Sequence, residues 1–184
     1  SFFTALYHAF VQPNNVADAD GACRLPDGGT VQAEGGSFFS TFSCWDTYRA
    51  AHPLYTLAAP SMVPAFVRSL VMQAEAQGHL PVWALWGKDN YCMVANHAVS
   101  IVAEAVCKDF GGFDRERAWA AVERTLRVSH PAKTDWETYL KYGYYPADLK
   151  PTESVSLSLE QAYDDYAAMC MARHLGKEAE TREF

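Results

Sequence analysis

Apolar residues recur at helical spacing in several stretches of this chain. The stretches are Phe2–Phe10, Met62–Ala76, Cys92–Cys107, Ala118–Leu126 and Leu157–Leu175. Such a repeat gathers apolar side chains on one helix face, so each stretch is predicted to be a helix that packs on a core. Glycines, which commonly end helices, follow three of these stretches, at Gly78, Gly111, Gly112 and Gly176. Serines in ESVSLSLE offer N-cap chemistry, and we expect the last helix to begin near Ser156.

Strand-like alternation is weak and confined to the short pieces Gly29–Val31 and Ser37–Phe42. Two long connections, Gln12–Gly36 and Leu140–Glu153, interrupt the helical pattern with Asn, Asp, Gly, Tyr and Pro. Connections of this length inside a compact domain are usually functional or disordered. The pattern predicts a mainly α fold of antiparallel helical hairpins with little strand, organised as a single domain over residues 1–184.

Composition narrows the classes of function. The chain has 184 residues, of which 49% are hydrophobic, and this suffices for one core. Its formal charge of −7 argues against a nucleic-acid partner, because phosphate binding needs clustered Lys and Arg. The apolar runs are interrupted before the roughly 20 residues that cross a bilayer, so no membrane partner is expected, and the first residues lack the features of a signal peptide. The five scattered cysteines indicate neither a disulfide framework nor a zinc site, and we expect most of them in the core.

Two segments combine the side chains that a sugar site needs. Thr41–Leu54 reads TFSCWDTYRAAHPL and Leu80–Ala98 reads LPVWALWGKDNYCMVANHA. Aromatic faces cover the C–H faces of a pyranose, while carboxylates and arginine take its hydroxyl groups. The chain is therefore predicted to bind carbohydrate.

The first segment places Asp46 and Arg49 three positions apart, so both lie on one face if CWDTYR begins a helix. A surface ion pair beside a core Trp45 explains that spacing equally well. The nearby aromatic residues Phe39, Phe42 and Tyr48 favour a ligand cleft.

The second segment offers Asp89, which stands between Trp86 and Tyr91 ahead of the helix expected from Cys92. Partial desolvation by the two rings would keep this carboxyl protonated near neutral pH, as a general acid requires. The alternative is a capping aspartate that accepts hydrogen bonds from free backbone amides.

Other polar residues have simpler interpretations. His97 lies five residues after Cys92, on a different helix face, so a hydrogen-bonded core histidine is favoured over a Cys–His nucleophile, although Cys92 could still line a cleft. Asp18 and Asp20 lack the remaining ligands of a calcium loop and indicate an Asx turn. The acidic residues Glu160, Asp164 and Asp165 predict a solvated helix face. Motifs of metalloproteases, phosphate loops and esterases are missing from the sequence.

The two segments, followed by ESVSLSLEQAYDDY, resemble the signature blocks of glycoside hydrolase family 92, the calcium-dependent inverting exo-α-mannosidases. The opening FFTALYHAF and NNVADADG are similar to the family as well, so the resemblance extends over nearly the whole chain. It implies an N-terminal β-sandwich packed on an (α/α)6 barrel, of which this chain would form one segment. The sandwich and the downstream barrel helices would then be partners outside these residues.

The resemblance also implies roles for individual residues. The general acid of the family is a glutamate in a block like GNETNCM, and the matching position in GKDNYCM is Asp89, whose side chain is one methylene shorter. The residues implied to bind substrate are Trp45, Asp46, Arg49, Trp86, Cys92, Thr152 and Glu153. Thr152 stands where α-1,2-selective members often have histidine, which puts that selectivity in question. Calcium is the implied cofactor; its ligands are not assigned, although Glu153 and Glu160 are suitable oxygen donors.

The resulting hypothesis is hydrolysis of terminal α-mannosides with inversion, for example of α-1,2-linked mannose in N-glycans or mannans. The catalytic base would lie beyond Phe184, so the isolated segment is expected to be inactive. Two alternatives stay open: a mannosyl phosphodiester hydrolase, whose good leaving group needs little protonation, and a non-catalytic helical module that binds sugar. The family resemblance suggests an extracellular or cell-envelope location.

Overall fold

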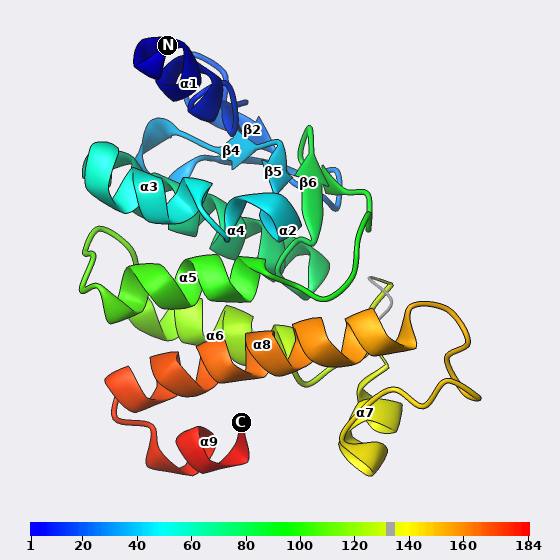
Figure 1. Cartoon of the computed structure of the whole chain (residues 1–184). Coiled ribbons are helices and arrows are strands. Elements are labelled where there is room, and N and C mark those ends of the chain that lie inside the picture. The colour runs from blue at the N-terminus through cyan, green and yellow to red at the C-terminus, as the bar shows by residue number, and fades with distance from the viewer. Residues whose placement is uncertain (132–134) are drawn as a thin grey trace.

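The computed structural model describes residues 1–131 and 135–184, and in it the chain is mainly helical with little strand (Figure 1). The helices are α1 (Phe2–Ala9), α2 (Cys44–Thr47), α3 (Ala51–Ala58), α4 (Val63–Gln77), α5 (Ala98–Cys107), α6 (Arg115–Thr125), α7 (Trp136–Tyr142), α8 (Ser154–His174) and α9 (Glu178–Glu183). The strands are β1 (Asn14–Asn15), β2 (Ala22–Arg24), β3 (Thr30–Gln32), β4 (Phe39–Ser40), β5 (Phe42–Ser43), β6 (Trp83–Leu85) and β7 (Lys88–Asp89). The predicted mainly α class is confirmed.

The larger helices form an open stack and not a closed ring (Figure 1). Helix α4 contacts α5 and α6, and α8 packs across α5 and α6 on the other side. Helix α5 lies in the middle and is apolar on nearly all sides, with Val99, Val102 and Val106 fully buried. A helix that is apolar all round is stable only when neighbours cover it, which explains the central position of α5.

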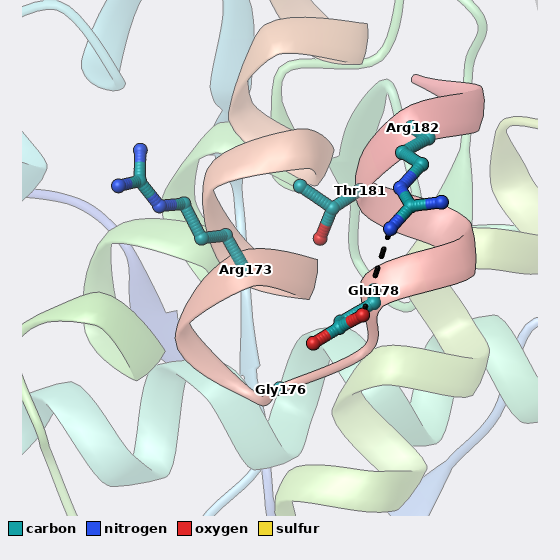
Figure 2. Close-up of a pocket in the computed structure, with 5 residues that line it drawn as sticks. All are labelled: Arg173, Gly176, Glu178, Thr181 and Arg182. Carbon is teal, nitrogen blue, oxygen red and sulfur yellow. Dashed lines mark ion pairs between the residues drawn. The ribbon is translucent and has the colours of Figure 1, made fainter.

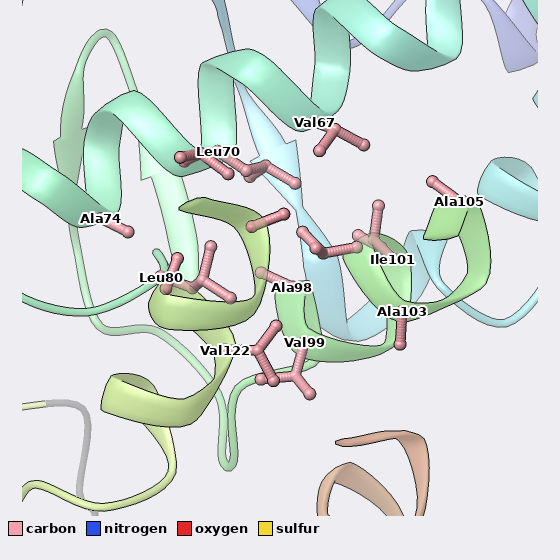
Figure 3. Packing of buried hydrophobic residues seen from close by; sticks show 14 of the residues in the cluster. Val67, Leu70, Ala74, Leu80, Ala98, Val99, Ile101, Ala103, Ala105 and Val122 are labelled. Carbon is pink, nitrogen blue, oxygen red and sulfur yellow. The ribbon is translucent and has the colours of Figure 1, made fainter. Parts of the chain in front are cut away.

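The main core fills the space between α4, α5 and α6 (Figure 3). Val67 and Leu70 of α4 are buried there, opposite Ala98 and Val102 of α5 and Val122 of α6. Small alanines on α5 let the helices approach closely, while the branched side chains occupy the gaps between them.

The strands form small antiparallel sheets along one side of the helices. β1 pairs with β4, β2 with β3, and β6 lies between β5 and β7. In this three-stranded sheet Ser43 is opposite Trp83, and Ala84 is opposite both Phe42 and Asp89. The pairing brings the two carbohydrate-like segments of the sequence side by side.

One predicted helix boundary was wrong. The helix expected from Cys92 begins at Ala98, because Tyr91, Met93 and Ala95 have positive φ values of 55°, 77° and 58°, which a right-handed helix excludes. The last helix begins at Ser154, close to the expected Ser156. The connection Gln12–Gly36 contains the β2–β3 hairpin, and Leu140–Glu153 includes the end of α7.

Some elements gave no usable sequence signal. Helices α2, α3, α7 and α9 span four to eight residues each, too few for a periodic apolar face to be recognised. Strands β6 and β7 are shorter still, and they form by pairing, β6 with both β5 and β7.

The lengths and apolar character of the helices bear on membrane crossing. Among the described residues no single helix is both long and apolar enough to cross a bilayer, and α3 together with Pro60–Gln77 reaches the required composition only across a bend of 109°.

The core packing predicts a large effect at Leu70. Replacing Leu70 with Ala should lower the free energy of unfolding by about 2–5 kcal/mol, because the side chain is 0% exposed and its removal leaves a cavity. Leu57→Ala is the matched control, since Leu57 is 81% exposed, and its effect should stay within about 0.5 kcal/mol. Urea unfolding of both variants measures the difference, and equal losses would contradict the packing described here.

Candidate functional site

The predicted site residues of the first segment lie on α2, directly after strand β5, and in the turn that follows α2. Cys44, the first residue of α2, is fully buried, and its thiol pKa is raised by burial and by the nearby charges of Asp89 and Asp164. Cys44 therefore lies between the β6–β7 hairpin and α8. The site is built where these elements meet.

Trp45 and Arg49 form one stacked unit. The Arg49 guanidinium carbon lies 4.6 Å from the centre of the Trp45 ring and 4.7 Å from that of Tyr48. Arg49 Nε also donates to the Trp45 carbonyl oxygen at 3.2 Å. Cation–π contacts of this kind fix the orientation of the guanidinium plane.

Asp46 is exposed on the same helix and accepts a hydrogen bond from Ser43 Oγ. The ion pair recorded for Arg49 in the described structure is with Glu160 of α8, at 3.2 Å, and not with Asp46. The local Asp46–Arg49 pair that the spacing allowed is therefore not the pair that forms. A residue more than one hundred positions away takes its place.

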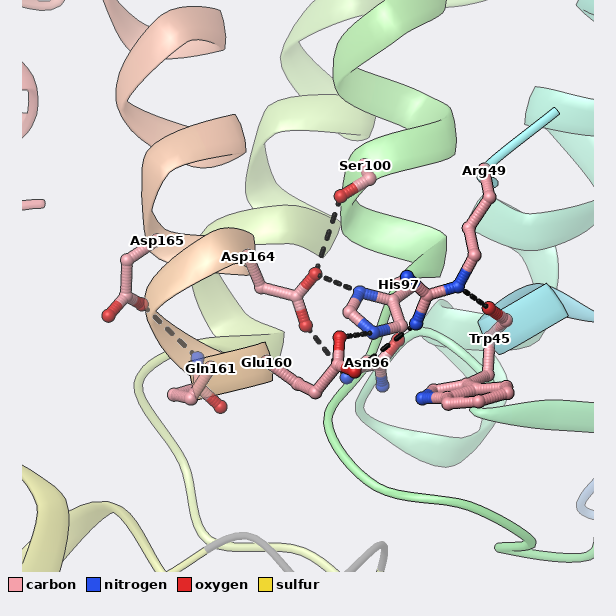
Figure 4. Close-up of polar contacts among 9 residues, drawn as sticks. All are labelled: Trp45, Arg49, Asn96, His97, Ser100, Glu160, Gln161, Asp164 and Asp165. Atoms are coloured by element: carbon pink, nitrogen blue, oxygen red, sulfur yellow. Dashed lines mark hydrogen bonds and ion pairs between the residues drawn. The ribbon is translucent and has the colours of Figure 1, made fainter. Parts of the chain in front are cut away.

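A chain of polar contacts runs inward from Arg49 (Figure 4). Glu160 Oε1 contacts Arg49, and Glu160 Oε2 lies 2.8 Å from His97 Nε2, although the carboxylate is poorly aligned with the ring for a hydrogen bond. His97 Nδ1 lies 2.8 Å from Asp164 Oδ1. Asp164 also accepts from the Asn96 backbone N–H at 2.8 Å.

His97 and Asp164 are completely buried. Both side chains are 0% exposed, and the ring of Tyr48 stacks on that of His97 at 4.1 Å between centroids. The prediction that His97 is a hydrogen-bonded core histidine is confirmed. The prediction of a solvated acidic face was wrong for Asp164, because α8 turns this carboxylate toward α5, where it meets partners that the linear sequence does not show.

Asp165, the next residue, is also largely removed from water. It accepts from the Tyr139 hydroxyl at 2.8 Å and from Gln161 Nε2 at 3.2 Å. Burial, together with the neighbouring charge of Asp164, raises the pKa of Asp165 to about 6. Burial and the charge of Asp165 in turn raise the pKa of Tyr139.

The carboxylate of Asp89 is held by backbone amides. Its Oδ2 accepts from Val82 N–H at 2.7 Å, and its Oδ1 accepts from the N–H groups of Trp83 and Tyr91 at 3.0 and 2.9 Å. No helix begins here, so the helix-cap part of the alternative interpretation was wrong, but its amide contacts are present. In this arrangement Asp89 joins β6, β7 and the following loop, and its role as general acid stays a prediction.

Trp86 is presented at the tip of the β6–β7 hairpin and is 67% exposed. Its φ of 51° is unusual for a bulky residue, and strained conformations of this kind gather at functional sites. Gly87 follows with φ of 82°, and a Cβ there would meet the Arg24 carbonyl oxygen at 2.8 Å. Only glycine fits this tight turn, which fixes the position of Trp86.

Thr152 and Glu153 line a hollow of about 590 Å³ at the start of α8, together with Lys150 and Leu157. Leu157 also belongs to a small apolar cluster against which Trp45 packs. The structure thus places this hollow beside the Trp45 unit. Cys92, in the loop after β7, is exposed.

The structure assigns no ligands to the calcium that the resemblance implies. Within the described ranges no group of three or more His, Cys, Asp or Glu side chains is arranged to hold a metal ion. Both oxygens of Glu160 contact nitrogen atoms of Arg49 and His97, which leaves it a poor calcium ligand.

A separate hollow of about 300 Å³ lies between α8 and α9 (Figure 2). Its lining includes Arg173 and the pair of Arg182 with Glu178, whose side chains are 81% and 85% exposed. It contains none of the predicted site residues, and its charged side chains are open to water.

The sequence did not predict that four residues would contact one another: Tyr48, His97, Glu160 and Asp164. The one available signal was the spacing of Glu160 and Asp164, which places two carboxylates on one face of α8. Their partners lie on α2 and just ahead of α5, and only the packing of α8 on α5 brings them together.

The family model described as glycosyl hydrolase family 92 catalytic domain matches residues 1–184, so the chain belongs to this family. No protein with a curated description matches it.

Solved structures agree with this assignment. The family GH92 α-mannosidase BT3965 from Bacteroides thetaiotaomicron is 38% identical, with a TM-score of 0.92 over 97% of this chain, and a second structure of it contains mannoimidazole. The family GH92 inverting mannosidase BT2199 from the same organism is 27% identical, with a TM-score of 0.89 over 99% of this chain. The chain spans 24% and 25% of the lengths of these two proteins.

The half-buried Asp165 predicts a pH-dependent stability. Its folded pKa of about 6 lies above the ordinary 3.8, so the ionised carboxylate is penalised in the folded protein at neutral pH. Asp165→Asn should therefore raise the free energy of unfolding at pH 7 by about 1–3 kcal/mol. As the pH falls toward about 4.5 the wild type should recover this difference, because the folded carboxyl takes up its proton while the unfolded one stays ionised.

Urea unfolding at the two pH values measures this effect. Asp148→Asn is the control, since Asp148 is exposed in the connection before α8. A stability difference for Asp165→Asn that does not change with pH would contradict the assigned burial.

Proposed function

We propose that the protein to which this chain belongs is an exo-acting α-mannosidase that hydrolyses terminal α-mannosides with inversion. Membership of family 92 over the whole chain carries the proposal. Two similar proteins support it: BT3965 is an α-mannosidase with a structure in complex with mannoimidazole, and BT2199 is an inverting mannosidase.

The geometry supports a sugar site near α2. The Trp45 ring with Arg49 across it, the exposed Asp46 carboxylate and the Trp86 ring offer stacking surfaces and hydroxyl partners. The hollow at Thr152 and Glu153 would take the neighbouring sugar unit. Thr152 has a shorter side chain than histidine, so selectivity for the α-1,2 linkage is not part of the proposal.

In the proposed reaction Asp89 protonates the departing glycosidic oxygen, while a carboxylate outside this chain activates water on the opposite face of the ring. Such carboxyl pairs stand roughly 6.5 to 9.5 Å apart in inverting enzymes. Asp89 would have to release one of its amide donors to present a proton. Calcium, which the resemblance implies, would require ligands beyond those of this chain, and no step is assigned to it.

The amide contacts of Asp89 favour a second candidate function. A carboxylate engaged by three backbone N–H groups is a poor proton donor in that state, which suits a substrate whose leaving group needs little protonation. A mannosyl phosphodiester has such a leaving group. This candidate uses the same sugar-binding residues.

Asp89→Asn tests the acid role in the full-length protein. Turnover of a mannobiose should fall by about 100-fold or more, whereas turnover of a mannoside with an activated aryl leaving group should fall much less. Asp114→Asn is a matched control, because Asp114 accepts two backbone N–H groups at the start of α6 and is not one of the site residues. Equal losses on both substrates would assign Asp89 to holding the hairpin, and unchanged rates would remove it from the mechanism.

Comparing two natural leaving groups separates the candidate functions. The α-mannosidase proposal expects faster turnover of mannobiose than of a mannosyl phosphodiester, and the second candidate expects the reverse. Product analysis beside calorimetry with mannose completes the test. Binding without release of product would support a non-catalytic sugar-binding module and contradict both enzymatic functions.

A further inference from the structure

We infer that Glu160 is a positioning residue, which holds Arg49 across the ring of Trp45 and so shapes the sugar-binding surface. This inference rests on the proposed function, because the surface it describes is the one proposed to bind sugar. Glu160 connects an exposed group to a buried one: its Oε1 lies 3.2 Å from Arg49 Nη2, and its Oε2 lies 2.8 Å from the buried His97 Nε2. The side chain of Arg49 is 46% exposed, and that of His97 is 0% exposed (Figure 4).

The inner half of this chain of contacts is rigid. His97 is held at Nδ1 by Asp164, and Tyr48 stacks on its ring with an interplanar angle of 24°. Asp164 is fixed in turn by the Asn96 backbone N–H. The imidazole cannot rotate without losing these contacts, so the position of Glu160 Oε2 is determined by the core.

The outer half of the chain transmits this position to Arg49. Because Glu160 Oε2 lies 2.8 Å from the fixed His97 ring, the carboxylate can direct its other oxygen over only a limited range. Arg49 Nη2 follows that oxygen, Arg49 Nε binds the Trp45 carbonyl oxygen, and the guanidinium plane lies between the rings of Trp45 and Tyr48. Among the described residues Nη1 has no recorded partner, so it is the donor left for a sugar hydroxyl.

This arrangement gives Glu160 a role different from those that its acidity suggests. Both of its oxygens contact nitrogen atoms, which leaves neither to act as a nucleophile, a base or a calcium ligand. Glu160 acts through Arg49, so removing it should weaken substrate binding and leave the chemical step largely intact.

A double-mutant cycle in the full-length protein tests the inference. Glu160→Ala should raise KM for an α-mannoside by about tenfold while kcat changes by less than about threefold, because binding to the ground state and the transition state is lost equally. Arg49→Ala should have an effect of similar size. The double variant should be no worse than Arg49→Ala alone, since Glu160 has nothing left to position. Additive losses would overturn the inference.

Glu104→Gln is the matched control. Glu104 pairs with Lys108 at 2.6 Å with exposed fractions of 22% and 44%, close to the 21% and 46% of Glu160 and Arg49. It lies outside the site, and KM should not change. Glu160→Gln keeps the shape of the side chain, and its increase in KM should be smaller than that of Glu160→Ala. It replaces Glu160→Ala in the cycle if that variant does not fold.

Crystal structures of the wild type and of Glu160→Ala give a measurement that does not depend on activity. The inference expects the Arg49 guanidinium to leave the Trp45 ring in the variant, and an unchanged stack would overturn it. If the wild type neither binds nor hydrolyses mannosides, the proposed function fails, whereas the positioning of Arg49 is still decided by these two structures.

Discussion

The buried carboxylate of Asp164 is the constraint on which the candidate site depends. A charge that is 0% exposed is tolerated only when hydrogen-bonding partners surround it, and here they are the Asn96 backbone N–H and the His97 ring. These partners tie α8 to the segment that leads into α5. Because His97 also meets Glu160, the same requirement extends outward to Arg49 and the surface where sugar binding is proposed.

The surface where sugar binding is proposed is held in place by two parts of the fold, the α5–α8 contact and the β5–β6–β7 sheet. Where α5 packs on α8, the buried polar groups satisfy one another's hydrogen bonds in one arrangement. The β5–β6–β7 sheet contains a hairpin whose shape depends on Asp89 and Gly87. Trp45 and Arg49 stand on the helical side, while Trp86 stands on the hairpin side. A sugar bound between them would be oriented by elements that cannot move independently of the core.

Asp89, the proposed general acid, also serves the fold. Its shorter side chain, compared with the glutamate of the family motif, lies back against backbone amides that hold the hairpin together. If Asp89 donates a proton, the enzyme must exchange one of these contacts for the glycosidic oxygen. A leaving group that needs no proton would avoid this exchange, which is why substrate class and the geometry of Asp89 are linked.

The sequence by itself determined the helical class, the long helices α4, α6 and α8, and the family to which the chain belongs, because apolar periodicity and short motifs are local properties. It also indicated that His97 is a buried, hydrogen-bonded residue. Only the tertiary structure decided that Arg49 pairs with Glu160 and not with Asp46, and that Asp164 is buried and not solvated. The reason is physical: a charged side chain takes its partner from whichever element packs nearest, and that choice is made by contacts between segments far apart in the chain.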